Sequence, residues 1–465
     1  MRISTGIEDL DNLMGGGFIE GSFNLVVGSQ GAGKTLFAVN YLLHHALEGD
    51  VLYVSLEESW KNIVSNMPRG MRHRYANVRE NVHYLDFSAV RPVLGKKALD
   101  VKLLGEVITT SMNVHNAKIV ALDGISPLLP YYRGVQELRA AIFELSQRIR
   151  RIGGTMLFTA ERNMANTGSV EEYVADSVIL LRYDGTKRRI QIMKVRGSDF
   201  VRGLHGFEIT ERGLKVYPNF LPKERQTKFR KVTFGIKGME RILGEIYSGS
   251  VILVTGPPGT GKTLMAYQFL NESARENGKC VFVSFKDTES MILKHAREFG
   301  FELSECSILE KNPVNVDAYE FMWEIYQHSK SATRVVIDGI NNVGESAESQ
   351  KIEHEIVKNF KSRGVTTLVT YTTPRIISSY NLGTSKILYL SDIIIDLRYA
   401  EIGSELRKFM VVVKSMGMNY EKGIIEYDIG PKGIKILGKA ELMEGVISGI
   451  PRHLEMKKRV EKFFK

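Results

Sequence analysis

Cysteine is scarce in this chain, and long apolar runs are absent. Only Cys280 and Cys306 occur among 465 residues, too few for a disulfide framework and without the spacing of a metal site. We therefore expect two buried thiols. No run of about 18 apolar residues is present, so no membrane-spanning helix is predicted. The first ten residues contain no apolar core of the kind found in signal peptides. These absences predict a cytoplasmic location and no membrane partner.

The sequence also lacks a concentration of charge of one sign. Its formal net charge is +10, but Lys and Arg outnumber Asp and Glu by 29 to 24 in residues 1–225 and by 34 to 29 in the rest. We interpret the basic runs at Lys187–Arg189 and Lys457–Lys465 as solvated faces of a strand and of an amphipathic helix. An evenly spread excess argues against nucleic acid as a partner.

What the sequence does contain is one phosphate-binding motif in two copies. The pattern G-x-x-x-x-G-K-[ST] occurs as GSQGAGKT and again as GPPGTGKT. In such a loop the glycines free backbone N–H groups to wrap the β-phosphate, the lysine reaches the β- and γ-phosphates, and the hydroxyl ligates magnesium. An apolar run that predicts a strand precedes each copy, and a helical pattern follows it. The predicted nucleotide-binding residues are Gly28, Ser29, Gln30, Gly31, Ala32, Gly33, Lys34 and Thr35 in the first copy, and Gly256, Pro257, Pro258, Gly259, Thr260, Gly261, Lys262 and Thr263 in the second.

Other features recur in the same order around each loop. The segment Thr5–Gly17 returns as Phe234–Glu245, and a Gly-x-Thr-x-x-x-Thr pattern occurs at 153–159 and again at 364–370. This order indicates a tandem duplication of one α/β domain, each copy a mostly parallel sheet flanked by helices. We expect a first domain at 1–222, a linker at 223–231, a second domain at 232–440 and a helical appendage at 441–465.

A metal site is predicted beside each loop. Apolar segments that end at Asp123 and at Asp338 look like Walker B strands, whose aspartate holds magnesium through its water shell while the loop threonine supplies a hydroxyl. The predicted metal residues are therefore Thr35 and Asp123 in the first domain, and Thr263 and Asp338 in the second.

A general base is predicted beside the first loop. Gly124 follows Asp123, so the base must come from another segment. The strand after the loop helix ends in Glu57 and Glu58, at the sheet edge expected to face the γ-phosphate, and these are the candidates. The alternative is that both glutamates only complement the dipole of a helix that starts near Ser59.

Two cations, Lys194 and Arg196, are spaced to project from one face of a predicted strand. They could balance charge on a γ-phosphate held by a neighbouring subunit, as an arginine supplied in trans does in other ATPases. The sequence leaves open the alternative that both are surface charges.

Together these features resemble the KaiC family, within the RecA superfamily of ring-forming ATPases. The resemblance covers nearly the whole chain and includes the segment Ala160–Leu180. It implies two tandem RecA-like P-loop domains, ATP and Mg²⁺ as cofactors, and a homohexamer of stacked rings with ATP between neighbouring subunits. It also implies catalysis in the first ring by Glu57 and Glu58, with Lys194 and Arg196 acting across the interface.

The second domain departs from the family pattern. Lys286 and Asp287 stand where the family has a Glu-Glu pair, and Met416 replaces the arginine of Lys-Val-Arg-Gly, although Lys414 is kept. A protonated lysine cannot act as a general base. We therefore expect the first domain to hydrolyse ATP and the second mainly to bind it for assembly or regulation, with a conformational output to a protein partner.

Other functions remain alternatives. Clock members of the family phosphorylate an adjacent Ser-Thr pair, but Leu388 and Tyr389 take those positions here, so autokinase activity is not expected. The hydroxyl residues nearby are Ser378, Ser379, Thr384, Ser385 and Ser391. A DNA-binding, recombinase-like ATPase would need cationic or aromatic residues in a loop facing a central channel, and the candidate loop Asn163–Ser169 has neither. A scaffold that uses nucleotide only as a switch is the third alternative.

Overall fold

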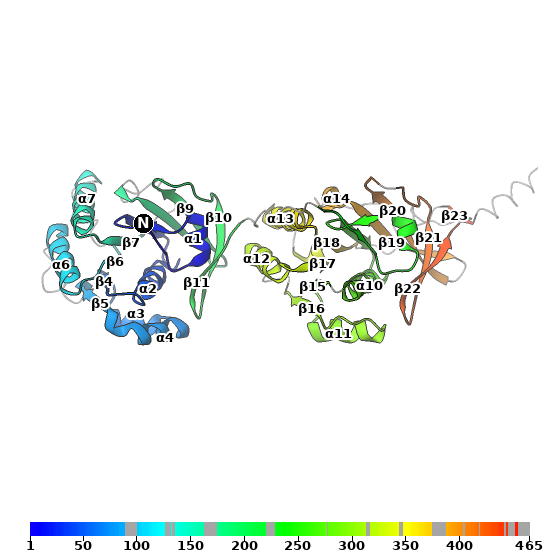
Figure 1. Ribbon diagram of the computed structural model, residues 1–465, viewed down its shortest axis with the longest axis horizontal. Coiled ribbons are helices and arrows are strands. Elements are labelled where there is room, and N and C mark those ends of the chain that lie inside the picture. Colours follow the sequence, from blue (N-terminus) through cyan, green and yellow to red (C-terminus); the bar gives the residue numbers. More distant parts are fainter. Residues whose placement is uncertain are drawn as a thin grey trace, which may run out of the picture. The chain divides into compact units, whose positions relative to one another are not determined.

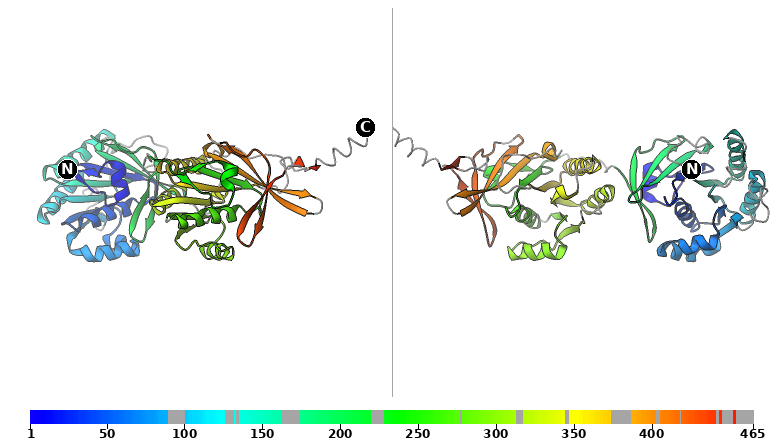
Figure 2. Two further views of the ribbon diagram at one scale, coloured as in Figure 1. Left: turned by 45° about the vertical axis from the view of Figure 1, so that its right-hand side comes forward. Right: turned by 180° about the vertical axis from the view of Figure 1, so that it is seen from behind.

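Contacts within the chain divide it into two units, Met1–Asn219 and Phe220–Lys465. They are seen in a computed structural model that describes residues 1–88, 100–125, 132, 135–161, 174–219, 228–276, 278–312, 317–343, 347–373, 387–402, 405–417, 419–440, 443–444 and 452–453. Figures 1 and 2 show the elements of each unit from three directions.

The first unit contains a nine-stranded sheet in the order β11-β10-β9-β8-β3-β7-β6-β4-β5. Strands β8 to β5 in this order are parallel, and β9, β10 and β11 continue the sheet antiparallel. The strands of the sheet are β3 (Phe23–Gly28), β4 (Val51–Ser55), β5 (Val82–Asp86), β6 (Ile119–Asp123), β7 (Thr155–Glu161), β8 (Ser177–Tyr183), β9 (Arg188–Val195), β10 (Leu204–Thr210) and β11 (Gly213–Tyr217), and β1 (Arg2–Ile3) pairs with β2 (Phe18–Ile19) outside it.

Helices cover both faces of the first sheet, as Figure 1 shows. The helices are α1 (Glu8–Met14), α2 (Lys34–His45), α3 (Trp60–Asn66), α4 (Arg69–Val78), α6 (Val101–Val114) and α7 (Val135–Arg151), with a 3-10 turn, η1, at Arg79–Asn81. Successive side chains of a strand point to opposite faces. Val26 and Tyr53 thus pack with α2, while Leu25 and Val54 pack with α6 and α7. Burial on both faces explains why these strands are almost wholly apolar.

The second unit repeats this sheet with the order β16-β15-β17-β18-β14-β19-β20-β21-β22. Strands β16 to β19 in this order are parallel and the last three are antiparallel, as in the first unit. The strands are β14 (Val251–Gly256), β15 (Lys279–Ser284), β16 (Cys306–Glu310), β17 (Ala332–Asp338), β18 (Thr366–Thr372), β19 (Ile393–Ile402), β20 (Glu405–Ser415), β21 (Ile425–Gly430) and β22 (Gly433–Lys439).

Helix α10 (Lys262–Arg275) covers one face of this sheet, and α12 (Ala318–His328) and α13 (Ala347–Arg363) lie on the other (Figure 1). The other elements are α9 (Met239–Leu243), α11 (Glu289–Glu298), α14 (Ile387–Leu390), the 3-10 turn η4 (Ile340–Val343) and the short pair β12 (Lys231–Val232) and β13 (Ile246–Tyr247). The same strand order in both units confirms two tandem RecA-like α/β domains.

The expected linker and appendage are only partly described. Residues 220–227 lie outside the described residues, so the linker at 223–231 stays a prediction. Within the expected helical appendage, the structure describes one short antiparallel pair, β23 (Met443–Glu444) with β24 (Arg452–His453). The remainder of 441–465, where a helix is expected, lies outside the described part of the chain.

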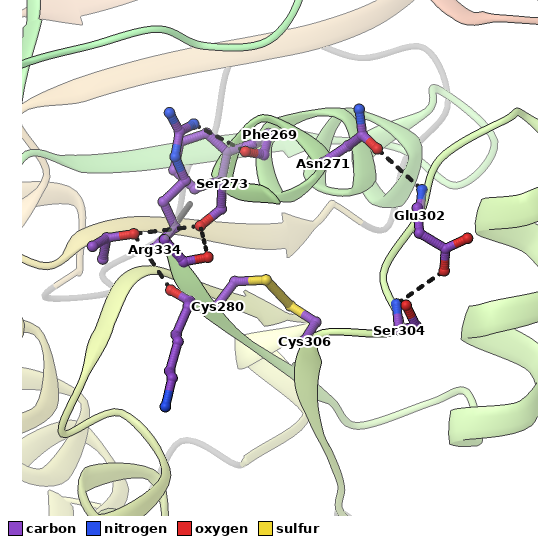
Figure 3. Close-up of a disulfide and its surroundings, with 11 residues drawn as sticks. Phe269, Asn271, Ser273, Cys280, Glu302, Ser304, Cys306 and Arg334 are labelled. Atoms are coloured by element: carbon purple, nitrogen blue, oxygen red, sulfur yellow. Dashed lines mark hydrogen bonds between the residues drawn. A yellow bond between two sulfur atoms is a disulfide. The ribbon is translucent and has the colours of Figure 1, made fainter. Parts of the chain in front are cut away.

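The cysteines correct one expectation, because they form a disulfide and are not free thiols (Figure 3). Cys280 lies on β15 opposite Cys306 on the neighbouring parallel strand β16, with their Cα atoms 4.8 Å apart. This separation is within the range that a disulfide spans. Counting cysteines could not reveal the pair, since 26 residues separate them in the sequence and only the pairing of the strands brings them together.

Reducing this disulfide is expected to lower the free energy of unfolding of the second unit by about 3 kcal/mol, because a loop of this length gains chain entropy when it is released. The two tryptophans, Trp60 and Trp323, lie in different units. Urea unfolding of a Trp60→Phe chain, followed by Trp323 fluorescence with and without reductant, measures the effect. The matched control is a Trp323→Phe chain, in which Trp60 should report an unchanged midpoint. An unchanged Trp323 midpoint on reduction would contradict the prediction.

None of the helices in the described residues is long and apolar enough to cross a membrane.

Candidate nucleotide sites

The first phosphate-binding loop connects β3 to α2 at the carboxyl edge of the first sheet. Gly28 ends β3 between β7 and β8, and a Cβ there would lie 2.5 Å from the Leu181 carbonyl oxygen, so only glycine fits. Gly33 precedes α2 with φ +103°, a conformation that glycine adopts without strain. The helix therefore begins at Lys34 with free N–H groups directed at the loop, the usual arrangement for binding phosphate.

Lys34 lies over this loop and faces several carboxylates. Its Nζ donates hydrogen bonds to the carbonyl oxygens of Gly28 at 3.1 Å and Ser29 at 3.0 Å. Burial lowers the pKa of Lys34, and the negative charges of Glu161, Asp123 and Glu57 oppose that shift. In the first site, the ammonium group of Lys34 therefore lies among three carboxylates.

The Walker B aspartate of the first site is held by two hydroxyl groups. Asp123 is buried at the end of β6, where Tyr53 Oη donates to Oδ2 at 2.6 Å and Thr159 Oγ1 donates to Oδ1 at 2.5 Å. Each bond uses one acceptor position of a carboxylate that has about four. Asp123 thus keeps a fixed orientation and has acceptor positions left for a metal or its water ligands.

Glu57 lies beside this aspartate, at the same edge of the sheet. Its carboxyl group packs against Gly124, where a Cβ would stand only 2.6 Å from Glu57 Cδ. Gly124 has φ +78°, so this position suits glycine in conformation as well as in size. The glycine after the Walker B strand therefore makes the space that brings Glu57 next to Asp123.

Glu58 points to a different neighbour. Its Oε1 accepts a long hydrogen bond of 3.4 Å from Asn66 Nδ2, and its backbone N–H donates to Ser55 Oγ at 3.2 Å. A helix does start near Ser59, as the sequence predicts: Ser59 caps α3 by accepting from the Asn62 N–H. Of the two glutamates, Glu57 is therefore the better placed for chemistry.

Lys194 and Arg196 lie at the opposite edge of the sheet from the phosphate-binding loop of their own chain. Lys194 is on β9, which ends at Val195, and Arg196 follows directly. Val195 pairs with Ser177, which is level with Asn24 near the start of β3. Measured along β3, Val195 therefore lies four residues, or about 13 Å, before Gly28. The structure does not bring these two cations to the first site of the same chain.

Arg196 is held in place by a buried aspartate. Its guanidinium donates to Asp176 Oδ1 at 3.0 Å, while Arg150 donates to Asp176 Oδ2 at 2.5 Å. Oδ2 also accepts from the backbone N–H of Phe23 at 3.0 Å, which ties the pair to the start of β3. With a side chain 60% exposed, Arg196 keeps donors directed to the surface.

The second loop has the same backbone but a different electrostatic surrounding. Lys262 Nζ donates to the carbonyl oxygens of Gly256 and Pro257, both at 2.7 Å. Burial lowers the pKa of Lys262 to about 8, and the charge of Lys286 adds to this shift while Asp338 opposes it. The Walker B aspartate thus faces the loop lysine in both sites, but Lys262 has a second cation beside it where Lys34 has Glu57.

Lys286 lies at the position that Glu57 has in the first domain. Its Nζ lies 2.9 Å from Asp338 Oδ2 and donates to Thr263 Oγ1 at 2.8 Å. Asp338 is fully buried and also accepts from Thr370 Oγ1 at 2.5 Å. The loop threonine, the Walker B aspartate and Lys286 therefore form one hydrogen-bonded cluster. The neighbouring Asp287 has its backbone N–H bonded to Ser284 Oγ at 2.9 Å.

The second domain has an aspartate equivalent to Asp176, but no arginine equivalent to Arg196. Asp392 accepts from Lys361 Nζ at 2.5 Å and from the Val251 N–H at 2.9 Å. Met416, at the position of Arg196, is 58% exposed, and Lys414 Nζ donates to the Ser391 carbonyl at 2.6 Å. The second domain therefore keeps the aspartate that holds Arg196 in the first domain, but it has no guanidinium group for that aspartate to hold.

The hydroxyl residues considered for phosphorylation are mostly undescribed. Ser378, Ser379, Thr384 and Ser385 lie outside the described residues, as does the loop Asn163–Ser169. Ser391 is fully buried, and its hydroxyl donates to the Ile387 carbonyl at 2.7 Å. Leu388 and Tyr389 lie on α14.

Sequence reasoning missed three residues that shape the first site, Tyr53, Thr159 and Glu161. It also missed Asp176, which holds Arg196 at the opposite edge of the sheet. The repeated Gly-x-Thr-x-x-x-Thr pattern held a signal for Thr159, because its last threonine bonds the Walker B aspartate in both domains. The signal for Tyr53 was its replacement by Phe282 in the second copy, which has no hydroxyl for Asp338. Glu161 and Asp176 gave no pattern that could be read without the fold.

Comparisons with known proteins agree with this architecture. A family model described as "ATPase: KaiC" matches residues 3–220 and again residues 232–441. A circadian clock oscillator protein KaiC from Acaryochloris marina is 28% identical over 98% of the chain and 92% of its own length. Proteins described in the same words from Picosynechococcus sp. and Synechococcus elongatus are 28% and 26% identical, each over 99% of the chain and 94% and 93% of their own lengths.

Proposed function

The chain belongs to the KaiC ATPase family, and on this premise we propose that its first domain hydrolyses ATP while its second domain binds ATP for assembly or regulation. One observation carries the proposal. The position beside the Walker B aspartate holds a carboxylate, Glu57, in the first domain and an ammonium group, Lys286, in the second. Only the first of these can accept a proton from an attacking water.

The first site suits a magnesium ion. Hydroxyl and carboxylate oxygens are the ligands that Mg²⁺ prefers, and Asp123 has acceptor positions beyond those used by Tyr53 and Thr159. Thr35 and Asp123 would hold the ion, and a bound Mg²⁺ neutralises charge on the phosphate oxygens.

The residues of the first site then have separate roles. The loop N–H groups and Lys34 bind the phosphates. Glu57 accepts the proton of a water whose oxygen forms a bond to the γ-phosphorus as the bond to the β,γ-bridging oxygen breaks, which leaves ADP and phosphate. Tyr53 and Thr159 keep Asp123 fixed.

A ring of subunits would complete the site. Arg196 lies too far from the loop of its own chain, and its anchored guanidinium is directed to the surface. We propose that it reaches the γ-phosphate of a neighbouring subunit in a homohexamer of stacked rings. A cytoplasmic location and a conformational output to a protein partner complete this proposal.

ATP turnover of Lys34→Ala and Lys262→Ala chains tests the asymmetry. The first change should reduce turnover by at least about tenfold, because it removes the phosphate-binding lysine of the hydrolytic site. The second should leave at least about half of it. Native mass spectrometry of both variants controls for assembly. If Lys262→Ala abolishes turnover while the oligomer persists and Lys34→Ala does not, the roles are reversed.

A further inference from the structure

The Lys286 ammonium lies between the two groups that a P-loop domain uses for magnesium. It donates to Thr263 Oγ1 at 2.8 Å and lies 2.9 Å from Asp338 Oδ2. These are the loop hydroxyl and the Walker B carboxylate. Their counterparts in the first domain are Thr35 and Asp123, and the position equivalent to Lys286 is there occupied by Glu57. In the second domain, an ammonium group of the chain itself thus lies between the oxygen atoms of Thr263 and Asp338.

The turn that carries Lys286 is fixed by the backbone and is shared by both domains. The Phe285 N–H donates to the Asp338 carbonyl, as the Leu56 N–H donates to the carbonyl of Asp123. Ser284 Oγ accepts from the N–H groups of both Lys286 and Asp287. The backbone therefore places residue 286 where the first domain has Glu57, with an ammonium group in place of a carboxylate.

The oxygen atoms of this cluster are engaged by groups that a magnesium ion would have to displace. Mg²⁺ needs near-octahedral oxygen ligands at 2.0–2.1 Å. The fully buried Asp338 accepts from Thr370 on Oδ1 and from Thr263 and Lys286 on Oδ2. A magnesium ion on the Thr263 hydroxyl would also lie against the ammonium group of Lys286, and the two positive charges would repel each other.

We propose that the second site binds a nucleoside triphosphate in its metal-free form, with the Lys286 ammonium in place of Mg²⁺. The inference rests on the proposed binding role of the second domain. A metal-free triphosphate carries two more negative charges than its magnesium complex, and Lys262 and Lys286 together face it. The first site, by contrast, surrounds Lys34 with Glu57, Asp123 and Glu161.

Nucleotide binding with and without a divalent cation tests this proposal. The full-length Lys34→Ala chain isolates the second site, and the Lys262→Ala chain isolates the first. Each is titrated with a fluorescent ATP analogue in Mg²⁺ and in EDTA. The second site should bind with a dissociation constant that changes less than about threefold, whereas the first should lose at least about tenfold in EDTA.

A metal count on the unaltered chain gives an independent reading. With ATP saturating and Mn²⁺ as the probe, electron paramagnetic resonance should detect one bound Mn²⁺ for every two nucleotides. In a Lys286→Met chain metal-free binding should weaken at least about tenfold, and a Lys286→Glu chain should bind one Mn²⁺ per nucleotide. Lys294→Met is the matched control, since that lysine is 73% exposed on α11 and away from the cluster.

The results distinguish metal-free binding at the second site from nucleotide binding by the second domain in general. Second-site binding that requires Mg²⁺, or one Mn²⁺ per nucleotide in the unaltered chain, overturns the metal-free site but leaves the second domain as a nucleotide binder. Absence of second-site binding in both buffers overturns the proposed binding role and the inference together. The Mn²⁺ count is made on the unaltered chain, so it tests the metal-free site even if a Lys286 variant fails to fold.

Discussion

A Glu57→Gln chain is expected to hydrolyse ATP about 10²- to 10⁴-fold more slowly than the unaltered chain, because that is the usual contribution of a positioned general base. Glutamine has nearly the shape of glutamate, so packing against Gly124 should persist. The loop and Lys34 are untouched, so the affinity of the first site for ATP should stay within about threefold. Steady-state turnover and analogue titration of the same preparation measure both quantities.

Two matched carboxylates serve as controls for this result. Glu58 follows in the same turn but lies against Asn66, so Glu58→Gln should cost less than Glu57→Gln. Asp287 holds the position equivalent to Glu58 in the second domain, and Asp287→Asn should leave turnover nearly unchanged. If Glu58→Gln gives the large loss and Glu57→Gln the small one, the base has been assigned to the wrong glutamate.

The fold could be predicted because its signals are local and repeated. Each phosphate-binding loop lies between an apolar run and a helical pattern, and this fixes a strand, a loop and a helix in order. The recurrence of the Walker B segments at Asp123 and Asp338 then predicts two copies of one domain, and the matching sheet orders confirm it.

The details of the sites depend on contacts that a single sequence does not contain. Lys286 could be recognised as a missing base, but its bonds to Thr263 and Asp338 require the three-dimensional turn. The Cys280–Cys306 disulfide likewise depends on the pairing of β15 with β16. In both cases a residue contacts a partner on another strand. Which strands are neighbours depends on the whole sheet, so these contacts cannot be predicted from the local sequence.

Arg196 tests whether the first site is completed by a neighbouring subunit. An Arg196→Ala chain should lose about 10³- to 10⁵-fold in turnover if its guanidinium stabilises charge on the γ-phosphate. Arg150→Ala is the matched control, because Arg150 binds the same Asp176 carboxylate. Equal losses in the two variants would mean that both act only by holding Asp176.

Mixing subunits distinguishes an arginine acting in trans from one acting within its own chain. Arg196→Ala subunits keep a complete loop, and Lys34→Ala subunits keep the arginine, so neither ring is active alone. After exchange at equal amounts, roughly a quarter of the interfaces combine an intact loop with an intact arginine, and about a quarter of normal turnover should return. An arginine acting on its own chain predicts no recovery. The register of β9 against β8 favours recovery, since it places Arg196 at the edge of the sheet away from its own Lys34.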